Sequence, residues 1–252
     1  MEGGGKKRMD LEGRVIVISG ASSGIGAATA RDLAGRGASV ALLARRRDRI
    51  EDLASSLAGQ GSLAVPMDLS KPKESERAAE AVMNHFGRVD AVVNNAGQML
   101  LASFENQPAT EWEEMISVNL LGAMRLTKAF LPALLSSKGD VVNVSSVAGR
   151  KARALSGGYS ATKWGMNGWS EALRQELSPK GCRVIVVEPG AVETELYTHI
   201  SDAKVRASSA QMYQEVGAID ASEVAKIIAF ALGMPKGVSL NEILVRPTGQ
   251  AY

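Results

Sequence analysis

The feature that most constrains the fold is a short apolar run that passes directly into a glycine-rich loop. Val15–Ser19 suits a strand that is buried on both faces of a parallel sheet. It is followed by Gly20-Ala-Ser-Ser-Gly24-Ile-Gly26, by an alanine-rich helix to about Arg36, and by a second apolar run at Ala38–Leu43. In such a βαβ unit, glycines let the backbone approach a pyrophosphate, and the helix N-terminus offers free N–H groups. The unit predicts dinucleotide binding; an ordinary glycine-rich turn between strand and helix is the alternative.

Strand and helix patterns continue to alternate along the chain without a break in composition. A length of 252 residues fits one large α/β domain or two small ones. The alternation predicts a single Rossmann-type, doubly wound domain with a seven-stranded parallel sheet over residues 10–252, after a flexible leader at residues 1–9. The further strands are expected at Ser62–Pro66, Val89–Val93, Asp140–Ser146, Arg183–Val187 and Glu242–Arg246, and the longer helices at Lys73–Phe86, Thr110–Ser136, Tyr159–Leu177 and Ser222–Leu232.

Charge and cysteine content exclude some classes of partner. The 29 basic and 27 acidic residues leave a net charge of +2, which gives no electrostatic reason to expect a nucleic acid or a membrane surface as a partner. No run approaches 18 consecutive apolar residues, so no membrane span is expected. A single cysteine, Cys182, cannot form an intrachain disulfide and suits a reducing cytosol, so we expect a cytoplasmic protein. No metal site is expected.

The end of the second strand indicates which dinucleotide is bound. A carboxylate there would accept a hydrogen bond from the ribose 2′-hydroxyl of NAD, whereas arginine suits the 2′-phosphate of NADP. The chain has Arg45 and Arg46 and no acid before Asp48. Arginine can hold a phosphate through two parallel charge-assisted hydrogen bonds, so we expect NADP. The alternative is a solvated basic cluster, which would be an unusual way to open a helix.

A tyrosine and a lysine are spaced to share one helix face. Tyr159 and Lys163 are four residues apart, which places their side chains one helical turn from each other. An ammonium close to a phenol favours the phenolate and lowers the pKa of the phenol. The pair could therefore serve as an acid and base tuned toward neutral pH, or it could be a solvated helix face of no catalytic importance.

Taken together, the motifs resemble those of the short-chain dehydrogenase/reductase family over essentially all of residues 10–252. They follow one another in the family's order, and the family's serine is Ser146 rather than Ser145 because it lies thirteen positions before the tyrosine. The motifs are Gly20-x-x-x-Gly24-Ile25-Gly26, Asp68-Leu69, Asn94-Asn95-Ala96-Gly97, Asn119, Ser146, Tyr159-x-x-x-Lys163 and Pro189-Gly190-x-Val192-x-Thr194.

The resemblance implies hydride transfer between a nicotinamide and a carbonyl or alcohol carbon. Tyr159 would exchange the proton with the substrate oxygen, and Lys163 would lower its pKa and hold the nicotinamide ribose. Ser146 would hydrogen-bond the substrate oxygen, and Asn119 would hold a water that relays protons to Lys163. Ser23 stands where some NADP-using relatives have a basic residue. The implied cofactor residues are Gly20, Ser22, Ser23, Gly24, Ile25, Gly26, Arg45, Arg46, Asp68, Leu69, Asn95, Ala96, Gly97, Tyr159, Lys163, Pro189, Gly190, Val192 and Thr194, whereas Asn94 would be structural.

The substrate is less constrained. The pocket is expected to involve Gln98, Ser146, the loop that follows Ser146, and a mobile lid at about residues 193–218 that contains Tyr197. Arg150 or Arg153 in that loop could bind a substrate carboxylate, or both could be solvated or form subunit contacts. His199 is expected to pack or to lie at the surface rather than to catalyse.

Two stretches, Ala148-Gly-Arg150 and Asn241–Thr248, resemble the subgroup that contains clavulanic acid dehydrogenase and the NADP-dependent 3-hydroxy acid (serine) dehydrogenases. The resemblance implies reduction of a small aldehyde or ketone, with a carboxylate as a candidate substituent. It also implies a homodimer or homotetramer packed through the helices that contain Asn119 and Tyr159. A non-catalytic NADP(H)-sensing regulator is the alternative function, and an epimerase or dehydratase on the same fold is a further rival.

Overall fold

The computed structural model describes residues 11–57 and 61–251, so the expected leader at residues 1–9 lies outside the described residues. Its centre is a seven-stranded sheet in which every neighbouring pair of strands is parallel, in the order β3-β2-β1-β4-β5-β6-β9. The predicted Rossmann-type fold is therefore confirmed. The strands are β1 (Val15–Ser19), β2 (Ser39–Ala44), β3 (Ser62–Pro66), β4 (Ala91–Asn94), β5 (Asp140–Val144), β6 (Arg183–Pro189) and β9 (Glu242–Val245).

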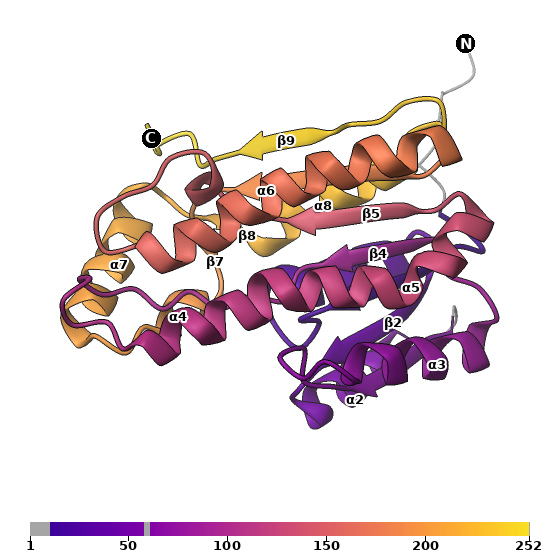
Figure 1. Cartoon of the computed structure of the whole chain (residues 1–252), viewed down its shortest axis with the longest axis horizontal. Helices are drawn as coiled ribbons and strands as arrows, with labels where there is room; N and C mark the ends of the chain where they lie inside the picture. Colours follow the sequence, from indigo (N-terminus) through magenta and orange to yellow (C-terminus); the bar gives the residue numbers. More distant parts are fainter. Residues whose placement is uncertain (1–10, 58–60, 252) are drawn as a thin grey trace, which may run out of the picture.

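Helices cover both faces of this sheet, which makes three layers (Figure 1). On one face α1 (Gly24–Ala34), α2 (Arg47–Ser56) and α8 (Ala221–Gly233) pack on strand side chains such as Ile16 and Leu42. On the other face α3 (Glu74–Phe86), α5 (Ala123–Ser137) and α6 (Gly157–Leu177) pack on the alternate side chains, such as Val17 and Leu43. Because both faces are covered, strands such as β1 and β6 contain uninterrupted apolar runs, which is why they could be found from the sequence.

The strand order reverses between β1 and β4, which is the place where such sheets bind ligands. The chain leaves β1 for β2 and β3 on one side and returns to β4, β5 and β6 on the other. The loops that follow β1 and β4 therefore diverge and leave a crevice at the carboxyl ends of the strands. This topology positions the candidate site.

The helix expected at Thr110–Ser136 consists of three segments in the structure. They are α4 (Ala109–Met115), a π-helical turn η1 (Ile116–Gly122) that contains Asn119, and α5. The whole stretch, Ala109–Ser137, is long and apolar enough to cross a membrane by length and composition alone. Leu126 and Phe130 of this stretch are buried in the core against the sheet, as in a helix of a globular domain.

The segment expected as an irregular lid contains a helix. α7 (Ala203–Glu215) begins at Asp202, whose carboxylate accepts hydrogen bonds from the backbone of the first turn. Only Ser209 of this helix is buried, so its sequence has little of the apolar periodicity by which a helix is recognised. Two short strands that were not expected, β7 (Val192–Glu193) and β8 (Ile219–Asp220), pair with each other and hold the two ends of the segment together. Three short 3₁₀ turns complete the described chain, η2 (Val147–Gly149), η3 (Ser178–Lys180) and η4 (Glu195–His199).

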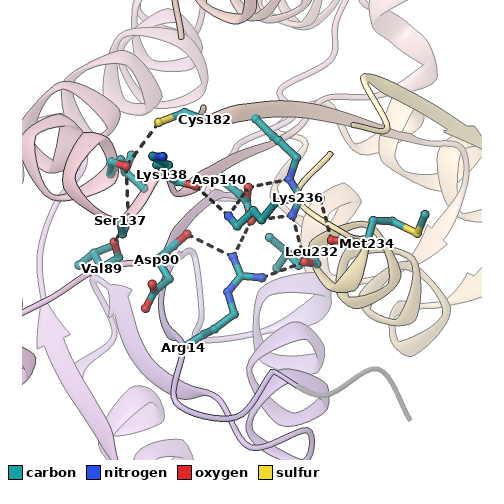
Figure 2. Close-up of polar contacts among 12 residues, drawn as sticks. Arg14, Val89, Asp90, Ser137, Lys138, Asp140, Cys182, Leu232, Met234 and Lys236 are labelled. Atoms are coloured by element: carbon teal, nitrogen blue, oxygen red, sulfur yellow. Dashed lines mark hydrogen bonds and ion pairs between the residues drawn. The ribbon is translucent and has the colours of Figure 1, made fainter. Parts of the chain in front are cut away.

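At the amino ends of the strands, a fully buried carboxylate is surrounded by cations (Figure 2). Asp140 accepts two hydrogen bonds from Arg183, at 2.8 and 2.9 Å, and further bonds from Arg14 and Lys236. Both arginines also donate to the carbonyl of Leu232 in the last turn of α8. Burial alone would raise the pKa of the Asp140 carboxyl, but the hydrogen bonds from Arg183 and the three nearby positive charges outweigh it and lower that pKa. The cluster fastens α8 to the sheet at the end opposite the candidate site.

Candidate active site

A cavity of about 640 Å³ lies at the carboxyl ends of the strands. This volume is in the range of small-molecule and cofactor sites. The cavity wall contains almost all of the residues that were expected to bind a cofactor. They are Gly20, Ser22, Ser23, Gly24, Ile25, Arg45, Arg46, Asp68, Leu69, Asn95, Ala96, Gly97, Tyr159, Lys163, Pro189, Gly190, Val192 and Thr194.

The glycine loop forms a cradle that side chains would fill. Gly20 has a φ of +68°, and a Cβ added there would lie 2.8 Å from the Cα of Ala96. Gly26 is not on the cavity wall, but a Cβ added there would lie 2.3 Å from the carbonyl oxygen of Gly20, so this glycine lets α1 pack against the loop. Ser23, the residue before α1, makes no side-chain cap hydrogen bond. The first turn of α1 therefore faces the cavity with backbone donors suited to a pyrophosphate.

Strand ends next to the loop are held by hydrogen bonds. The Ser19 hydroxyl accepts from the backbone N–H groups of Asn95 and Ala96, and the Asn95 amide donates to the Ser19 carbonyl at 3.0 Å. Asn94 points away from the cavity and donates to Thr127 and Asn143, which agrees with its expected structural role. The ends of β1 and β4 are thus fixed relative to each other where an adenosine would lie.

Asp68 presents a carboxylate at the same wall. It accepts hydrogen bonds from the backbone N–H and the hydroxyl of Ser70. Burial acts to raise its pKa, but these hydrogen bonds and the charges of Arg45 and Lys71 lower it. Asp68 is therefore ionised at neutral pH and can accept a hydrogen bond from an amino group.

Arg46 binds the glycine loop itself. Its Nε and Nη2 atoms donate to the Ser22 hydroxyl at 3.0 and 2.9 Å, and Nη2 also donates to Ser23 at 2.7 Å. Its Nη1 atom donates to Glu195 at 2.8 Å. Arg45 is exposed at the cavity rim beside Asp68. A phosphate placed here would meet two arginines and two hydroxyls.

The four residues expected to be catalytic lie close together but not all on the cavity wall. Tyr159 and Lys163 on α6 and Ser146 after β5 line the cavity, and Lys163 Nζ lies 5.7 Å from the centre of the Tyr159 ring. Asn119 lies behind the wall and is fully buried. Its amide donates to the Gln98 carbonyl and to Thr162, and its oxygen accepts from the Gln98 N–H. Asn119 thus ties the loop after β4 to α6, and its contact with a relay water stays a prediction.

The expected electrostatic effect of Lys163 on Tyr159 is not found. Burial raises the pKa of Tyr159 above its ordinary value, and a hydrogen bond with Ser146 only partly opposes that shift. Burial also lowers the pKa of Lys163 to about 8. Lys163 Nζ donates to the Val144 carbonyl at 2.9 Å, so its charge is directed to the end of β5 rather than to the phenol. In this structure Ser146 is the group that favours the phenolate.

On the substrate side of the cavity, two residues that were expected in the pocket, Arg150 and Tyr197, do not lie on its wall. Gln98 and Arg153 line the cavity as expected, but Arg150 does not. The Arg150 guanidinium donates to the buried carboxylate of Glu188 at 2.7 Å and to Glu242, so it fastens the η2 loop to β6 and β9. Position in the loop after Ser146 was too coarse a signal to separate Arg150 from Arg153.

Tyr197 lies behind the wall of the cavity instead of on it. Its ring packs against that of Tyr213, with centroids 5.2 Å apart, and Tyr213 rather than Tyr197 is on the wall. The same segment contributes Leu196, His199 and Met212. α7, which the sequence did not predict, turns the segment back so that Met212 and Tyr213 reach the same cavity wall.

Gln250 lines the cavity and was not expected. Its side-chain oxygen accepts from the N–H of Ala191 at 2.9 Å, and a Cβ on Gly190 would lie 2.1 Å from that oxygen. Gly190 therefore leaves room for the C-terminal segment to return to the site. No motif marks this glutamine, because its contact depends on how the chain folds back after β9.

Comparison with known proteins gives a consistent result. The chain matches the short chain dehydrogenase family over residues 14–205. It is 35% identical over 249 residues to an uncharacterised oxidoreductase of Listeria monocytogenes, covering 97% of this chain and 100% of that protein.

Solved structures agree with this result. An alcohol dehydrogenase from the archaeon Thermococcus sibiricus, complexed with 5-hydroxy-NADP, is 34% identical with a TM-score of 0.86, over 95% of this chain and 98% of that one. The 3-ketoacyl-(acyl-carrier-protein) reductase from Brucella melitensis, complexed with NADH, is 30% identical with a TM-score of 0.84, over 95% and 99%.

The sheet, the glycine cradle and these relatives lead to the same assignment. The protein is an oxidoreductase that uses a nicotinamide cofactor. It belongs to the short chain dehydrogenase family.

Proposed function

We propose that the protein is an NADP(H)-dependent, cytoplasmic oxidoreductase that interconverts a carbonyl and an alcohol, with Tyr159 as the general acid and base. The observation that carries the proposal is the meeting of Tyr159, Ser146 and Lys163 on the wall of the cavity that also contains the glycine cradle. A bound nicotinamide would supply or accept the hydride. The chain's own residues have to bind the cofactor and the substrate, orient them toward each other and move the proton.

The residues divide that work according to their contacts. Ser146 bonds with Tyr159, so both groups can direct hydrogen bonds to one substrate oxygen. In reduction Tyr159 donates its proton to that oxygen and is left as a phenolate, toward which the Ser146 hydroxyl can then turn its hydrogen. Lys163 is cationic below about pH 8 and lies on the same cavity wall, so its ammonium would hold the hydroxyls of a nicotinamide ribose. Tyr159 is almost fully buried, so water competes little for the proton.

A direct experiment is to mix the protein with NADPH and a panel of aldehydes and ketones and to follow the loss of NADPH absorbance. Turnover of any carbonyl supports the enzyme. If NADPH binds but no carbonyl is turned over, the alternative of an NADP(H)-sensing regulator is favoured. The oxidoreductase names of the relatives favour the enzyme.

Preference for NADP(H) should depend on Arg45. We expect Arg45→Gln to raise the Kd for NADPH by about tenfold, the order of one charge-assisted hydrogen bond, and to leave the Kd for NADH unchanged. Fluorescence titration measures both. The matched control is Arg47→Gln, because Arg47 bonds with Glu51 on the exposed side of α2 and is not on the cavity wall. Equal weakening of both cofactors by Arg45→Gln would contradict the assignment to the 2′-phosphate.

A small carbonyl substrate that carries a carboxylate would bind near Arg153. We expect Arg153→Met to raise KM for such a substrate by about tenfold or more, because a charged hydrogen-bond partner is lost, and to leave KM for a neutral aldehyde of similar size unchanged. Arg150→Met is the control, since Arg150 faces Glu188 instead of the cavity. Steady-state kinetics with the two substrates decide the question, and equal changes in both KM values would remove the carboxylate from the proposal.

A homodimer or homotetramer is proposed from the apolar residues exposed on the helices that contain Asn119 and Tyr159. These are Ile116, Leu121, Met124 and Trp164. Exposed apolar surface of this kind is typical of protein interfaces. Sedimentation should show an oligomer that Leu121→Glu dissociates, and a monomeric wild type would contradict the proposal.

A further inference from the structure

Glu195 lies where the proposed phosphate site meets the lid. We propose that Glu195 is an internal counter-ion for Arg46 that the 2′-phosphate of NADP(H) displaces, so that this carboxylate sets how strongly the protein favours NADP(H) over NAD(H). The inference rests on the proposed use of NADP(H) and adds a residue that determines specificity.

The hydrogen bonds of Arg46 show why displacement is required. Its contacts with Ser22 and Ser23 are made to neutral hydroxyls of the glycine loop, which can remain when a phosphate binds. The contact with Glu195 is different, because a carboxylate occupies the Nη1 side of the guanidinium at 2.8 Å. An anion that approaches Arg46 from the cavity therefore meets a negative charge already in place.

The ion pair is suited to exchange. The side chains of Arg46 and Glu195 are 37% and 43% exposed, so the pair adds little to stability. Hydrogen bonds from Arg46 and Arg49 lower the pKa of Glu195 to about 2, so the carboxylate remains charged at any working pH. A ribose phosphate carries more charge and more acceptor oxygens than a carboxylate. It can therefore replace Glu195 on Arg46.

Glu195 keeps a second cation after the exchange. Arg49 Nη1 donates to its two oxygens at 2.8 and 3.1 Å, from one turn further along α2. Glu195 also follows Thr194, at the start of the segment whose ends β7 and β8 hold together. Exchange at Arg46 would thus reduce the attachment of the lid base to α2 from two arginines to one. Phosphate recognition and lid attachment share one carboxylate.

Binding of the two cofactors tests the proposal without any turnover. Wild type, Glu195→Gln and Glu193→Gln are titrated with NADPH and with NADH, using the full chain. Removing the Glu195 charge should lower the Kd for NADPH by about three- to tenfold, the size expected for one like charge near a partly exposed site. The Kd for NADH should change by less than about twofold. Glu193→Gln makes the same charge change two residues away, on the exposed side of β7, and should alter neither Kd. Unchanged or weaker NADPH binding, or equal tightening of both cofactors, would overturn the proposal.

A protein that already lacks Arg46 tests whether the effect of Glu195→Gln on NADPH binding acts through Arg46. In an Arg46→Gln protein, Glu195→Gln should lose most of its effect on NADPH, because the two residues form one contact and their effects are not additive. A full effect in that background would overturn the displacement.

A third measurement concerns the protein without cofactor. Amide hydrogen exchange at residues 194–199 should be faster in Glu195→Gln than in Glu193→Gln, and equal rates would contradict the link to the lid base. If wild type binds neither NADPH nor NADH, the proposed function fails. If it prefers NADPH but Glu195→Gln behaves as wild type, only this inference fails.

Discussion

Replacing Tyr159 with phenylalanine is expected to lower kcat for carbonyl reduction by about a hundredfold to ten thousandfold, the usual contribution of a positioned general acid. The phenyl ring keeps the packing of Tyr159, which is almost fully buried next to Met115. Only the hydroxyl is lost, and with it the proton that the substrate oxygen needs. Initial rates of NADPH oxidation measure the loss, and the Kd for NADPH should stay close to that of wild type.

Tyr197→Phe is the matched control for this prediction. Tyr197 belongs to the same packed cluster but is not on the cavity wall, so removal of its hydroxyl should leave kcat nearly unchanged. If Tyr159→Phe kept the wild-type rate, the proton would have to come from another group, and Tyr213 would be the next candidate because it lies on the same wall.

The largest effect on stability is expected at the far end of the sheet, from Asp140→Asn. Breaking a buried ion pair by removing one partner typically costs about 3–5 kcal/mol, because the remaining charge is left uncompensated. Here Arg183, which is 4% exposed, would lose its carboxylate, and Arg14 would lose the same partner. Urea denaturation with a linear extrapolation measures the change in the free energy of unfolding.

The pH dependence gives the same cluster an independent test. The pKa of Asp140 is lower in the folded protein than its ordinary value of 3.8, so the unfolded chain binds a proton first on acidification. The contribution of Asp140 is therefore fully present above about pH 4–5 and is lost as the pH falls toward the folded pKa. Wild type should lose stability over that range more steeply than Asp140→Asn.

Glu51→Gln serves as the control, because its pair with Arg47 is exposed and should contribute little. Equal acid sensitivity of wild type and Asp140→Asn, or a change in stability no larger than that of the control, would contradict the role given to the cluster.

The sequence predicted those parts of the structure that are determined by residues close together in the chain. Strands such as β1 and β6 were found because burial on both faces gives them uninterrupted runs of apolar residues. The site residues at strand ends followed, because the carboxyl ends of parallel strands meet at one edge. The helix α7 was missed because only one of its residues is buried, so its sequence shows no clear apolar face. Its start is instead fixed by the Asp202 carboxylate, which caps the first turn.

Errors at the substrate end have one physical cause. Arg150 and Arg153 are three residues apart, yet one faces Glu188 and the other faces the cavity. The choice between them depends on a partner from β6, which no local pattern contains. Gln250, which was not expected, also reaches the site through a contact with a distant part of the chain. The effect of Lys163 on Tyr159 was misjudged because spacing along a helix gives no information about desolvation.

The pairing of β7 with β8 has a consequence for how such an enzyme could acquire new substrates. Since the two strands bring Val192 next to Ile219, the residues between them form a closed loop whose entry and exit are held side by side. The entropy of closing a loop rises slowly with its length, by about 0.6 kcal/mol for each doubling. Insertions and deletions between these strands that leave Thr194, Glu195 and the packed Ile200 in place can therefore accumulate at little cost to folding, while the glycine cradle and Tyr159 keep their positions. The loop can therefore change in evolution independently of the rest of the domain, and relatives that act on different substrates can keep the same cofactor site and the same proton donor.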